Sequence, residues 1–180
     1  MATITISEAL AEIKTINKRL SKKEEFIAEH LMRPEQMRDP LEGQGGQRAA
    51  IISERQSMLD LQQRVVNIRL AIQQVNMTTD LTVLGVTKTM AAWLVWRRDV
   101  APKEQAFLTK IRQGVAKLRQ DLLKQGMKVV SGEQASGRDV LVNIDEKLLA
   151  EGSEHLERTL GELDGMLSLK NATIMITIPD

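Results

Sequence analysis

Residues 48–76 contain neither proline nor glycine, and their apolar side chains recur every seven positions. The repeat forms two rows: Ile51, Met58, Val65 and Ile72 in one, and Leu61, Ile68 and Val75 in the other. This is the a/d spacing of helices that pack along a seam. A third stripe runs beside the first row and consists of Ile52, Leu59 and Val66. The segment therefore predicts a long central helix that buries more than a narrow seam, with Glu54 as the polar residue in its second row.

A second amphipathic helix precedes this one. Thr5 and Glu8 have the spacing of a capping box, so a helix should begin just after Thr5. Pro34 disfavours helical geometry in the residue before it, and the helix should end near Arg33. Together the two helices predict an antiparallel helical hairpin over residues 5–76.

The loop of this hairpin spans residues 34–47. It holds two prolines and three glycines, which are the strongest local signals for a loop. It is longer than a connection between two helices needs. Two interpretations remain open for its tip, which includes Met37 and Leu41: a mobile segment, or a surface that grips a partner.

The segment after the central helix changes character. Asn76 favours the left-handed conformation that ends a helix. Residues 79–84 are β-branched and alternate well enough to predict a short strand. Thr87 is then expected to cap a third helix.

This third helix is predicted over residues 87–125. Its apolar residues keep their phase across Pro102, which predicts one long helix kinked at that proline rather than two unrelated helices. Gly126 should end it. Short apolar strands on either side of a loop rich in Ser, Gly, Gln and Ala then predict a β-hairpin over residues 127–144.

Residues 146–178 predict a final helix and a terminal strand. Gly161 and Gly165 weaken this helix unless a neighbour packs closely against them. The end of the helix, SLKNATIMITI, repeats the order of QQVNMTTDLTV at the end of the central helix: an apolar helix, Asn, one residue, Thr and an extended segment. From this repetition we expect the two strands to lie near each other in one small sheet.

The composition favours one mainly helical domain. The chain has 180 residues and a formal charge of +1, and aromatic residues make up only 2% of it. Compact enzymes seldom contain so few aromatics, whereas a helical core of Leu, Ile, Val, Met and Ala does not need them. We predict a single domain over residues 1–180: a long antiparallel coiled-coil hairpin packed with two further helices, plus a small antiparallel β element.

Four stretches follow one another in a recognisable order: IKTINKRL, LDLQQRVVNIRLAIQQVNMTTDL, TKTMAAWLVWRRD and LERTLGELDGMLSLKNATIMI. The most specific pieces are Asn76-Met77-Thr78-Thr79, Arg97-Arg98-Asp99, and Leu163-Asp164-Gly165 ahead of Asn171. In this pattern the chain resembles the septicolysin-like family of small helical bacterial and phage proteins. The resemblance covers most of the chain and implies a long helical hairpin with a small β element and no established enzymatic role.

The residues form no recognisable catalytic or metal-binding motif. The chain has no cysteine, which excludes thiolate metal sites and cysteine nucleophiles. His30 and His155 are its two histidines, and neither has a ligand partner three or four residues further on. The glycine-rich segments 43–46 and 131–137 lack the frame of a phosphate-binding loop. We therefore predict no catalytic residue, no cofactor and no metal.

Two basic groupings are candidates for a nucleic-acid surface. One comprises Lys14, Lys18, Arg19, Lys22 and Lys23 on the first helix, and the other comprises Arg97, Arg98, Lys110, Arg112, Lys117 and Arg119 on the third. With a formal charge of +1, we interpret both as solvated helix faces. Trp93 and Trp96 are either anchors for a partner or packing residues within the chain.

The leading hypothesis is a non-enzymatic structural or assembly protein that forms homo-oligomers through its helices. The candidate interface residues are Ile52, Leu59, Val66, Trp93 and Trp96. A bacteriophage particle would suit such a protein, as a capsid decoration or as an accessory between head and tail. The alternatives are a nucleic-acid-associated protein that uses the two basic faces, and an enzyme whose carboxylates meet in the bundle.

The expected location is the cytoplasm or a virion. The segment MATITISEAL lacks a basic stretch followed by an apolar run, so no signal peptide is predicted. The longest apolar run, near residues 90–96, is far shorter than the roughly 20 residues that cross a bilayer.

Overall fold

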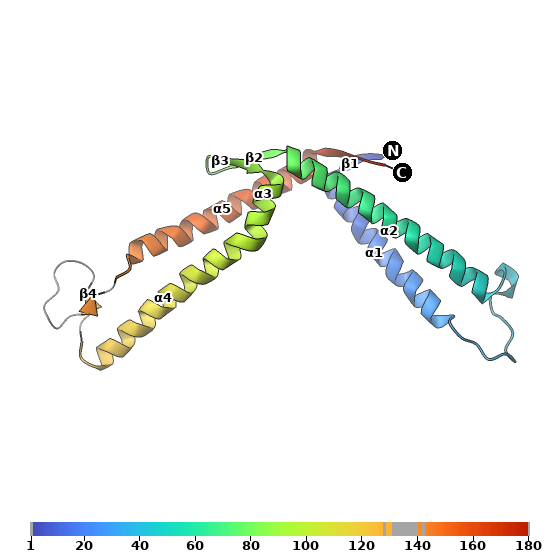
Figure 1. The fold of residues 1–180 in the computed structure, drawn as a ribbon, viewed down its shortest axis with the longest axis horizontal. Coiled ribbons are helices and arrows are strands. Elements are labelled where there is room, and N and C mark those ends of the chain that lie inside the picture. The colour runs from blue at the N-terminus through green and yellow to red at the C-terminus, as the bar shows by residue number, and fades with distance from the viewer. Residues whose placement is uncertain (1, 128, 131–139, 142, 180) are drawn as a thin grey trace. The chain divides into compact units, whose positions relative to one another are not determined.

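The computed structural model describes residues 2–127, 129–130, 140–141 and 143–179. Within these residues the chain is mainly helical with short strand pairs (Figure 1), and the predicted fold class is confirmed. The chain forms two compact units, whereas its length predicts one domain. Unit 1 comprises the chain up to Thr78 and again from Ser168, and unit 2 comprises Thr79–Leu167.

Unit 1 contains an antiparallel pair of long helices. Helices α1 (Ile6–Glu29) and α2 (Gln47–Thr78) lie side by side (Figure 1), joined by a loop that holds the short 3-10 helix η1 (Glu42–Gln44). This is the hairpin that the heptad pattern predicts. The predicted capping box is present too, because the Thr5 hydroxyl accepts the Glu8 N–H at 3.2 Å and the Glu8 carboxylate accepts the Thr5 N–H at 2.8 Å.

The two ends of the chain meet in unit 1. Strand β1 (Ala2–Thr5) precedes α1 and pairs antiparallel with β6 (Met175–Ile178). The sequence predicts β6 but not β1, because the residues before α1 show the signal of a helix beginning, with Thr5 in a capping box. Ile176 and Ile178 are buried while Met175 is exposed, as the alternation of side chains along a strand requires.

Two ion pairs join α1 to α2. The Lys23 ammonium lies 2.5 Å from the Glu54 carboxylate, which explains the polar residue in the apolar row of α2. The Arg64 guanidinium donates to the Glu12 carboxylate at 2.9 Å and to the Pro179 carbonyl oxygen at 3.1 Å. Arg64 therefore ties α2 both to α1 and to the chain end that follows β6.

Unit 2 begins with a β-hairpin. Strands β2 (Asp80–Val83) and β3 (Val86–Thr89) pair antiparallel across a two-residue turn. The turn residues Leu84 and Gly85 have φ values of 45° and 79°. Positive φ at both central residues is the type I′ geometry that matches the twist of paired strands.

The predicted helix cap at Thr87 is wrong. Thr87 belongs to β3, and the next helix is capped by the Thr89 hydroxyl, which accepts the Ala92 N–H at 3.2 Å. The misplacement follows from the turn sequence. Leu-Gly is not among the usual signals for a two-residue hairpin turn, so the second strand has no clear sequence signature.

The third helical segment runs from α3 (Met90–Val95) through a π-helical turn, η2 (Trp96–Val100), into α4 (Ala101–Lys124). Pro102 has no N–H, and its ring would clash with the carbonyl four residues before it in a regular helix. The π-helical turn widens the helix just before the proline, and the Ala101 N–H donates to the Trp96 carbonyl five residues back. The predicted continuous but kinked helix is confirmed, and its bend is visible in Figure 1.

Helix α4 ends as predicted. Gly126 has a φ of 73°, its N–H donates to the Leu123 carbonyl, and the Met127 N–H donates to the Leu122 carbonyl. These bonds form the Schellman motif, in which a left-handed glycine satisfies the last carbonyls of a helix.

The β-hairpin predicted over residues 127–144 is not what the structure shows. Strands β4 (Val129–Val130) and β5 (Val140–Leu141) pair in parallel, a direction that a tight hairpin turn does not connect. Strands of two residues carry too little apolar pattern to indicate their direction. The predicted loop between them lies outside the described residues.

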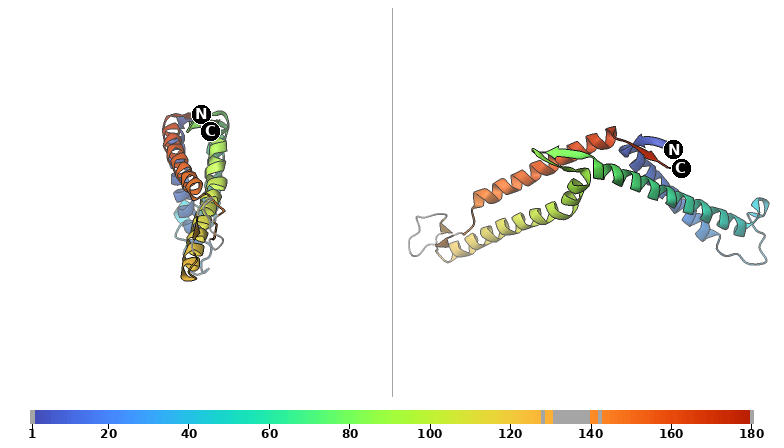
Figure 2. Two further views of the ribbon diagram at one scale, coloured as in Figure 1. Left: turned by 90° about the vertical axis from the view of Figure 1, so that its left-hand side faces the viewer. Right: turned by 45° about the horizontal axis from the view of Figure 1, so that its top comes forward.

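Helix α5 (Glu146–Thr173) runs beside α4 in the opposite direction (Figures 1 and 2). Its Leu156 forms a buried cluster with Ala101 and Leu108 of α4. Ion pairs between α5 and the preceding helical segment join Arg97 to Asp164, at 3.0 Å, and Arg119 to Glu146. The two further helices thus form a hairpin of their own.

Apart from the two-residue strands β4 and β5, the two halves of the chain repeat one arrangement: strand, helical segment, helix, strand. The ends of α2 and α5 match, because the Thr78 hydroxyl donates to the Gln74 carbonyl and the Thr173 hydroxyl donates to the Leu169 carbonyl. The two strand pairs also have the same register. In each pair, the residue just before a helix faces the first residue of the other strand: Thr5 faces Met175, and Thr89 faces Asp80. The repetition seen in the sequence therefore extends through the fold.

Two expectations about these helix ends are wrong. Asn76 does not end α2 in the left-handed conformation, since the helix continues to Thr78 and Leu84 is the one non-glycine residue with positive φ among those described. The strands after α2 and α5 do not share a sheet either. β2 pairs with β3, which leads into α3, and β6 pairs with β1, which leads into α1.

Replacing Gly161 or Gly165 with alanine should stabilise α5. A Cβ at either position would meet no heavy atom within 4 Å beyond the local helix backbone. Alanine favours a helix interior over glycine, so we expect the free energy of unfolding to rise by about 0.5–1 kcal/mol in urea denaturation. Gly126→Ala is the control, since its φ of 73° strains a residue with a Cβ and should lower stability. Destabilisation by both α5 variants would contradict the open space beside them.

Candidate interaction surface

Helix α2 carries apolar side chains on two opposite faces. The first face packs against α1 and contains the buried Ile68 with the half-buried Leu61 and Ile72. It corresponds to the predicted heptad seam. A helix of a simple hairpin needs one such face, with polar residues opposite.

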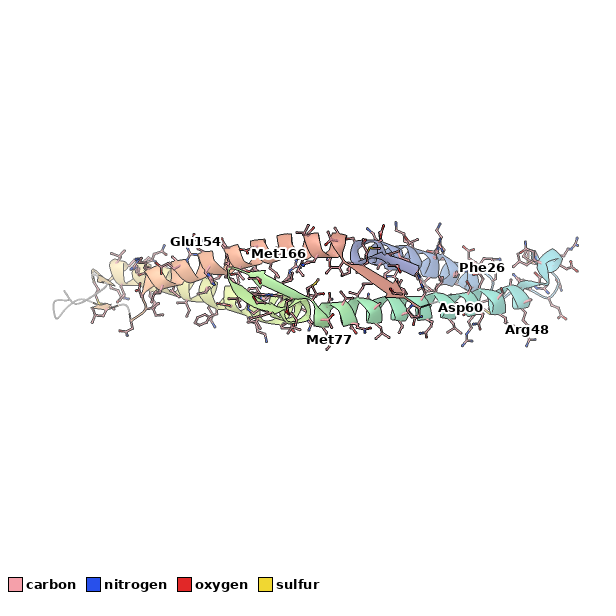
Figure 3. All side chains as sticks on the ribbon, turned by 90° about the horizontal axis from the view of Figure 1, so that it is seen from above. Phe26, Arg48, Asp60, Met77, Glu154 and Met166 are labelled. Carbon is pink, nitrogen blue, oxygen red and sulfur yellow. The ribbon has the colours of Figure 1, made fainter. Side chains whose placement is uncertain are left out.

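The second face of α2 is exposed. Successive residues of an α-helix are rotated by about 100°, which places five apolar residues of α2 within an arc of about 40° on the side away from Ile68. Their side chains are between 47% and 68% exposed: Ile52, Leu59, Val66, Leu70 and Met77. We call this set the α2 stripe. Figure 3 marks the length of the helix with Arg48, Asp60 and Met77.

The sequence identified part of this stripe. Ile52, Leu59 and Val66 are predicted interface residues, and the structure leaves them exposed, as that role requires. Leu70 and Met77 extend the stripe but are missed by a strict seven-residue repeat, because the spacing changes to four residues after Val66. Leu70 and Met77 can be identified from the sequence by the rotation of about 100° per residue, which places them at the same angle around the helix as the other three.

The side chains beside the stripe are mostly uncharged. Five exposed glutamines flank it: Gln56, Gln62, Gln63, Gln73 and Gln74. Two of their amides donate along the helix, from Gln56 to Asp60 at 2.9 Å and from Gln63 to Asn67 at 3.0 Å. Depletion of charge around an apolar centre is typical of protein interfaces.

The equivalent face of α5 has no such stripe. Counted back from the helix ends Thr78 and Thr173, the positions that correspond to the α2 stripe are Lys147, Glu154, Gly161, Gly165 and Ala172. These residues are charged or small. Since α5 forms the same kind of hairpin without an apolar outer face, the fold of a hairpin does not require the α2 stripe.

The predicted role of Trp93 in a partner interface is wrong. Trp93 is buried, and its indole N–H donates to the Leu81 carbonyl at 3.1 Å. Trp96 is half-buried and lies edge-on to Trp93, with ring centroids 5.5 Å apart. The Lys88 ammonium lies 4.6 Å from the Trp93 ring centroid. The β2–β3 hairpin, whose second strand the sequence does not reveal, therefore places both tryptophans in the packing of unit 2.

One carboxylate organises the loop between α1 and α2. Asp39 accepts the Leu41 N–H and the Gln47 N–H, each at 2.9 Å. Gln47 is the first residue of α2, whose first turn contains no acidic side chain, so Asp39 supplies the negative charge that favours a helix beginning. Of the two predicted tip residues, Met37 is exposed and Leu41 is half-buried.

The histidines and acidic residues of the described segments do not form a group of metal ligands. Among them, no three His, Asp or Glu side chains converge as ligands would. His30 stacks on Phe26, with ring centroids 4.3 Å apart, and its Nδ1 lies 2.7 Å from the Phe26 carbonyl oxygen. No described helix has the length and apolar character needed to cross a membrane.

The basic groupings are partly neutralised within the chain. In the grouping on the third helical segment, Arg97, Arg98 and Arg119 each pair with a carboxylate. On α1, Lys23 pairs with Glu54, while the other members are exposed. The nucleic-acid hypothesis stays a prediction, and no contact among the described residues favours it over solvated faces.

Comparison with known proteins shows a similar fold but indicates no function. No family model matches the chain, and no curated protein matches it. The fold is similar to that in the crystal structure of a functionally unknown conserved protein from Corynebacterium diphtheriae, with a TM-score of 0.59. The two sequences are 15% identical over 98% of this chain and 100% of the other. At that identity the likeness concerns the fold alone, and the resemblance to septicolysin-like proteins stays a prediction.

The loop carboxylate should make the stability of the helical hairpin depend on pH. Hydrogen bonds from Gln47 and Leu41 hold the pKa of Asp39 below its ordinary value of 3.8. A lowered pKa in the folded state means that the stabilisation is present above pH 3.8 and is lost as the pH falls through the folded-state pKa. We expect Asp39→Asn to be less stable than the wild type at pH 7, with the difference disappearing in acid denaturation profiles. A constant difference at all pH values would contradict this role.

Proposed function

We propose that this chain is a non-enzymatic assembly protein that acts through helical self-association, with the α2 stripe as its contact surface. The observation that supports this function is the second apolar face of α2. It is exposed in the single chain, bordered mainly by neutral amides with Arg48 and Arg55 toward the beginning of α2, and absent from the equivalent helix α5. Exposed apolar patches of this kind commonly mark interaction sites.

The size of the stripe fits a contact between two copies. Full burial of a Val, Leu, Ile or Met side chain is worth about 1.5–3 kcal/mol, so a half-exposed one still has about 1 kcal/mol to gain. Two copies would bury ten such side chains, for a total of about 10 kcal/mol. Association costs about 4–15 kcal/mol. At the lower end of this cost the net gain is about 6 kcal/mol, which corresponds to a dissociation constant of about 40 μM and hence to a dimer that forms at high protein concentration.

As a setting we propose a bacteriophage particle, in which the chain would decorate the capsid or serve as an accessory between head and tail. Support for this setting comes from the sequence: a small, mainly helical chain without a catalytic motif and with a resemblance to bacterial and phage proteins. Purification from the native source tests it. Capsid or tail proteins that remain bound through high-salt washing would support the setting, and purification free of them would count against it.

The assembly function predicts that a charge within the stripe dissociates the protein. By light scattering, the mass of the wild type at a few hundred micromolar should approach twice that of one 20.2 kDa chain. Leu59→Glu would bury a carboxylate without a partner, and should weaken the association at least about 100-fold. Leu10→Glu is the matched control, since Leu10 is a similarly exposed leucine on α1, and it should leave the mass unchanged.

Circular dichroism should show the same helix content for the wild type and both variants. A wild type that is strictly monomeric at these concentrations would overturn the assembly function. A dimer that survives Leu59→Glu would move the contact to another surface.

A further inference from the structure

Four of the five residues of the α2 stripe, all except Val66, have the same spacing when the helix is followed from either end. Ile52 and Leu59 are seven residues apart, and so are Leu70 and Met77. The midpoint of Ile52 and Met77 falls between residues 64 and 65, and so does the midpoint of Leu59 and Leu70. Because these four residues are symmetric about one centre, they match the same four residues of a second copy that is turned end for end.

We infer that two copies of this chain pair antiparallel through α2, about a two-fold axis that passes between residues 64 and 65. The inference rests on the proposed function, because it specifies the geometry of the same contact. In this register Ile52 faces Met77 of the partner subunit and Leu59 faces Leu70 of the partner subunit. A two-fold axis repeats each contact, so the same surface serves both copies.

The remaining positions of the seam fit the same register. Val66 faces Gln63 of the partner subunit, and Gln56 faces Gln73 of the partner subunit. An amide next to an aliphatic side chain, or next to another amide, introduces no buried charge. The contact extends over the 26 residues from Ile52 to Met77, which is about 39 Å of helix. The seam is thus apolar at Ile52, Leu59, Leu70 and Met77, and contains amides between these positions.

Charge favours the antiparallel direction over the parallel one. Arg48 and Arg55 lie near the line of the stripe toward the beginning of α2. In a parallel pair, each arginine would lie beside the same arginine of the other chain. Like charges brought together disfavour an interface. In the antiparallel register, Arg55 lies beside Gln74 of the partner subunit, and Arg48 lies near the carboxyl end of the partner's helix.

The contact between Arg48 and the carboxyl end of the partner's helix is electrostatically favourable for both helices. Helix α2 has no basic residue in its last turn, so its terminal carbonyls lack the positive charge that normally favours a helix end. Arg48 sits in the first turn of α2, where the dipole of its own helix disfavours a cation. Antiparallel pairing brings Arg48 of one copy toward the carbonyl end of the other and improves both environments.

Cysteine pairing can measure the register directly, because the protein contains no cysteine of its own. We would prepare Leu59→Cys and Leu70→Cys as separate full-length proteins and oxidise them with diamide, each alone and as an equal mixture. In the antiparallel register, the thiols meet only in dimers that contain one chain of each kind. We expect a disulfide-linked dimer in the mixture, involving up to about half of the chains after random exchange. Each variant alone should give at least about tenfold less.

The controls separate this inference from the proposed function. Leu10→Cys mixed with Leu70→Cys should give only the background of random collisions, since Leu10 lies on α1. Efficient linkage of Leu59→Cys to itself would establish a parallel pair and overturn the inference while leaving self-association intact. No linkage in the mixture, from a protein that still has the mass of a dimer, would also overturn it. A monomeric wild type would overturn both the inference and the function.

Discussion

Each unit depends on a short strand pair that joins the end of one long helix to the beginning of another. The Ile6 N–H donates to the Ile174 carbonyl at 3.2 Å, and the Met90 N–H donates to the Thr79 carbonyl at 2.8 Å. An isolated pair of four-residue strands would be marginal in water. Here one strand of each pair buries alternate side chains, such as Ile176 in β6 and Leu81 in β2. The strand pairs thereby determine where the helices begin and which faces of them are covered.

The proposed function depends on the face of α2 that α1 leaves uncovered. Helix α2 is held to α1 by the apolar seam and by the contacts of Arg64 and Glu54, and its outer face takes no part in them. The same structural position in α5 holds residues such as Glu154 and Gly161. One chain thus contains both the hairpin with an apolar outer face and the hairpin without it. The difference separates what folding requires of a helix from what a contact with another molecule would require.

Local features of the fold were predictable from the sequence. The capping box at Thr5, the kink at Pro102 and the helix end at Gly126 depend on the geometry of single residues and their immediate neighbours. The interface candidates were predicted less well. Leucine and valine at exposed helical positions could be recognised by their spacing, whereas Trp93 could not be assigned to the core without knowledge of the β2–β3 hairpin.

The sequence by itself determined that the long helices form, which of their faces are apolar, and the helix ends marked by Thr5 and Gly126, because these follow from backbone geometry and periodicity within a few residues. It did not determine the end of α1, which is Glu29 instead of the predicted Arg33, the end of α2 or the beginning of α3. Only the tertiary structure decided which strands pair, that the chain forms two units, and that one apolar face of α2 stays exposed while another is buried. These outcomes depend on contacts between residues far apart in the chain. The pairing of β1 with β6 joins the two ends of the sequence, and no local pattern encodes such a partner.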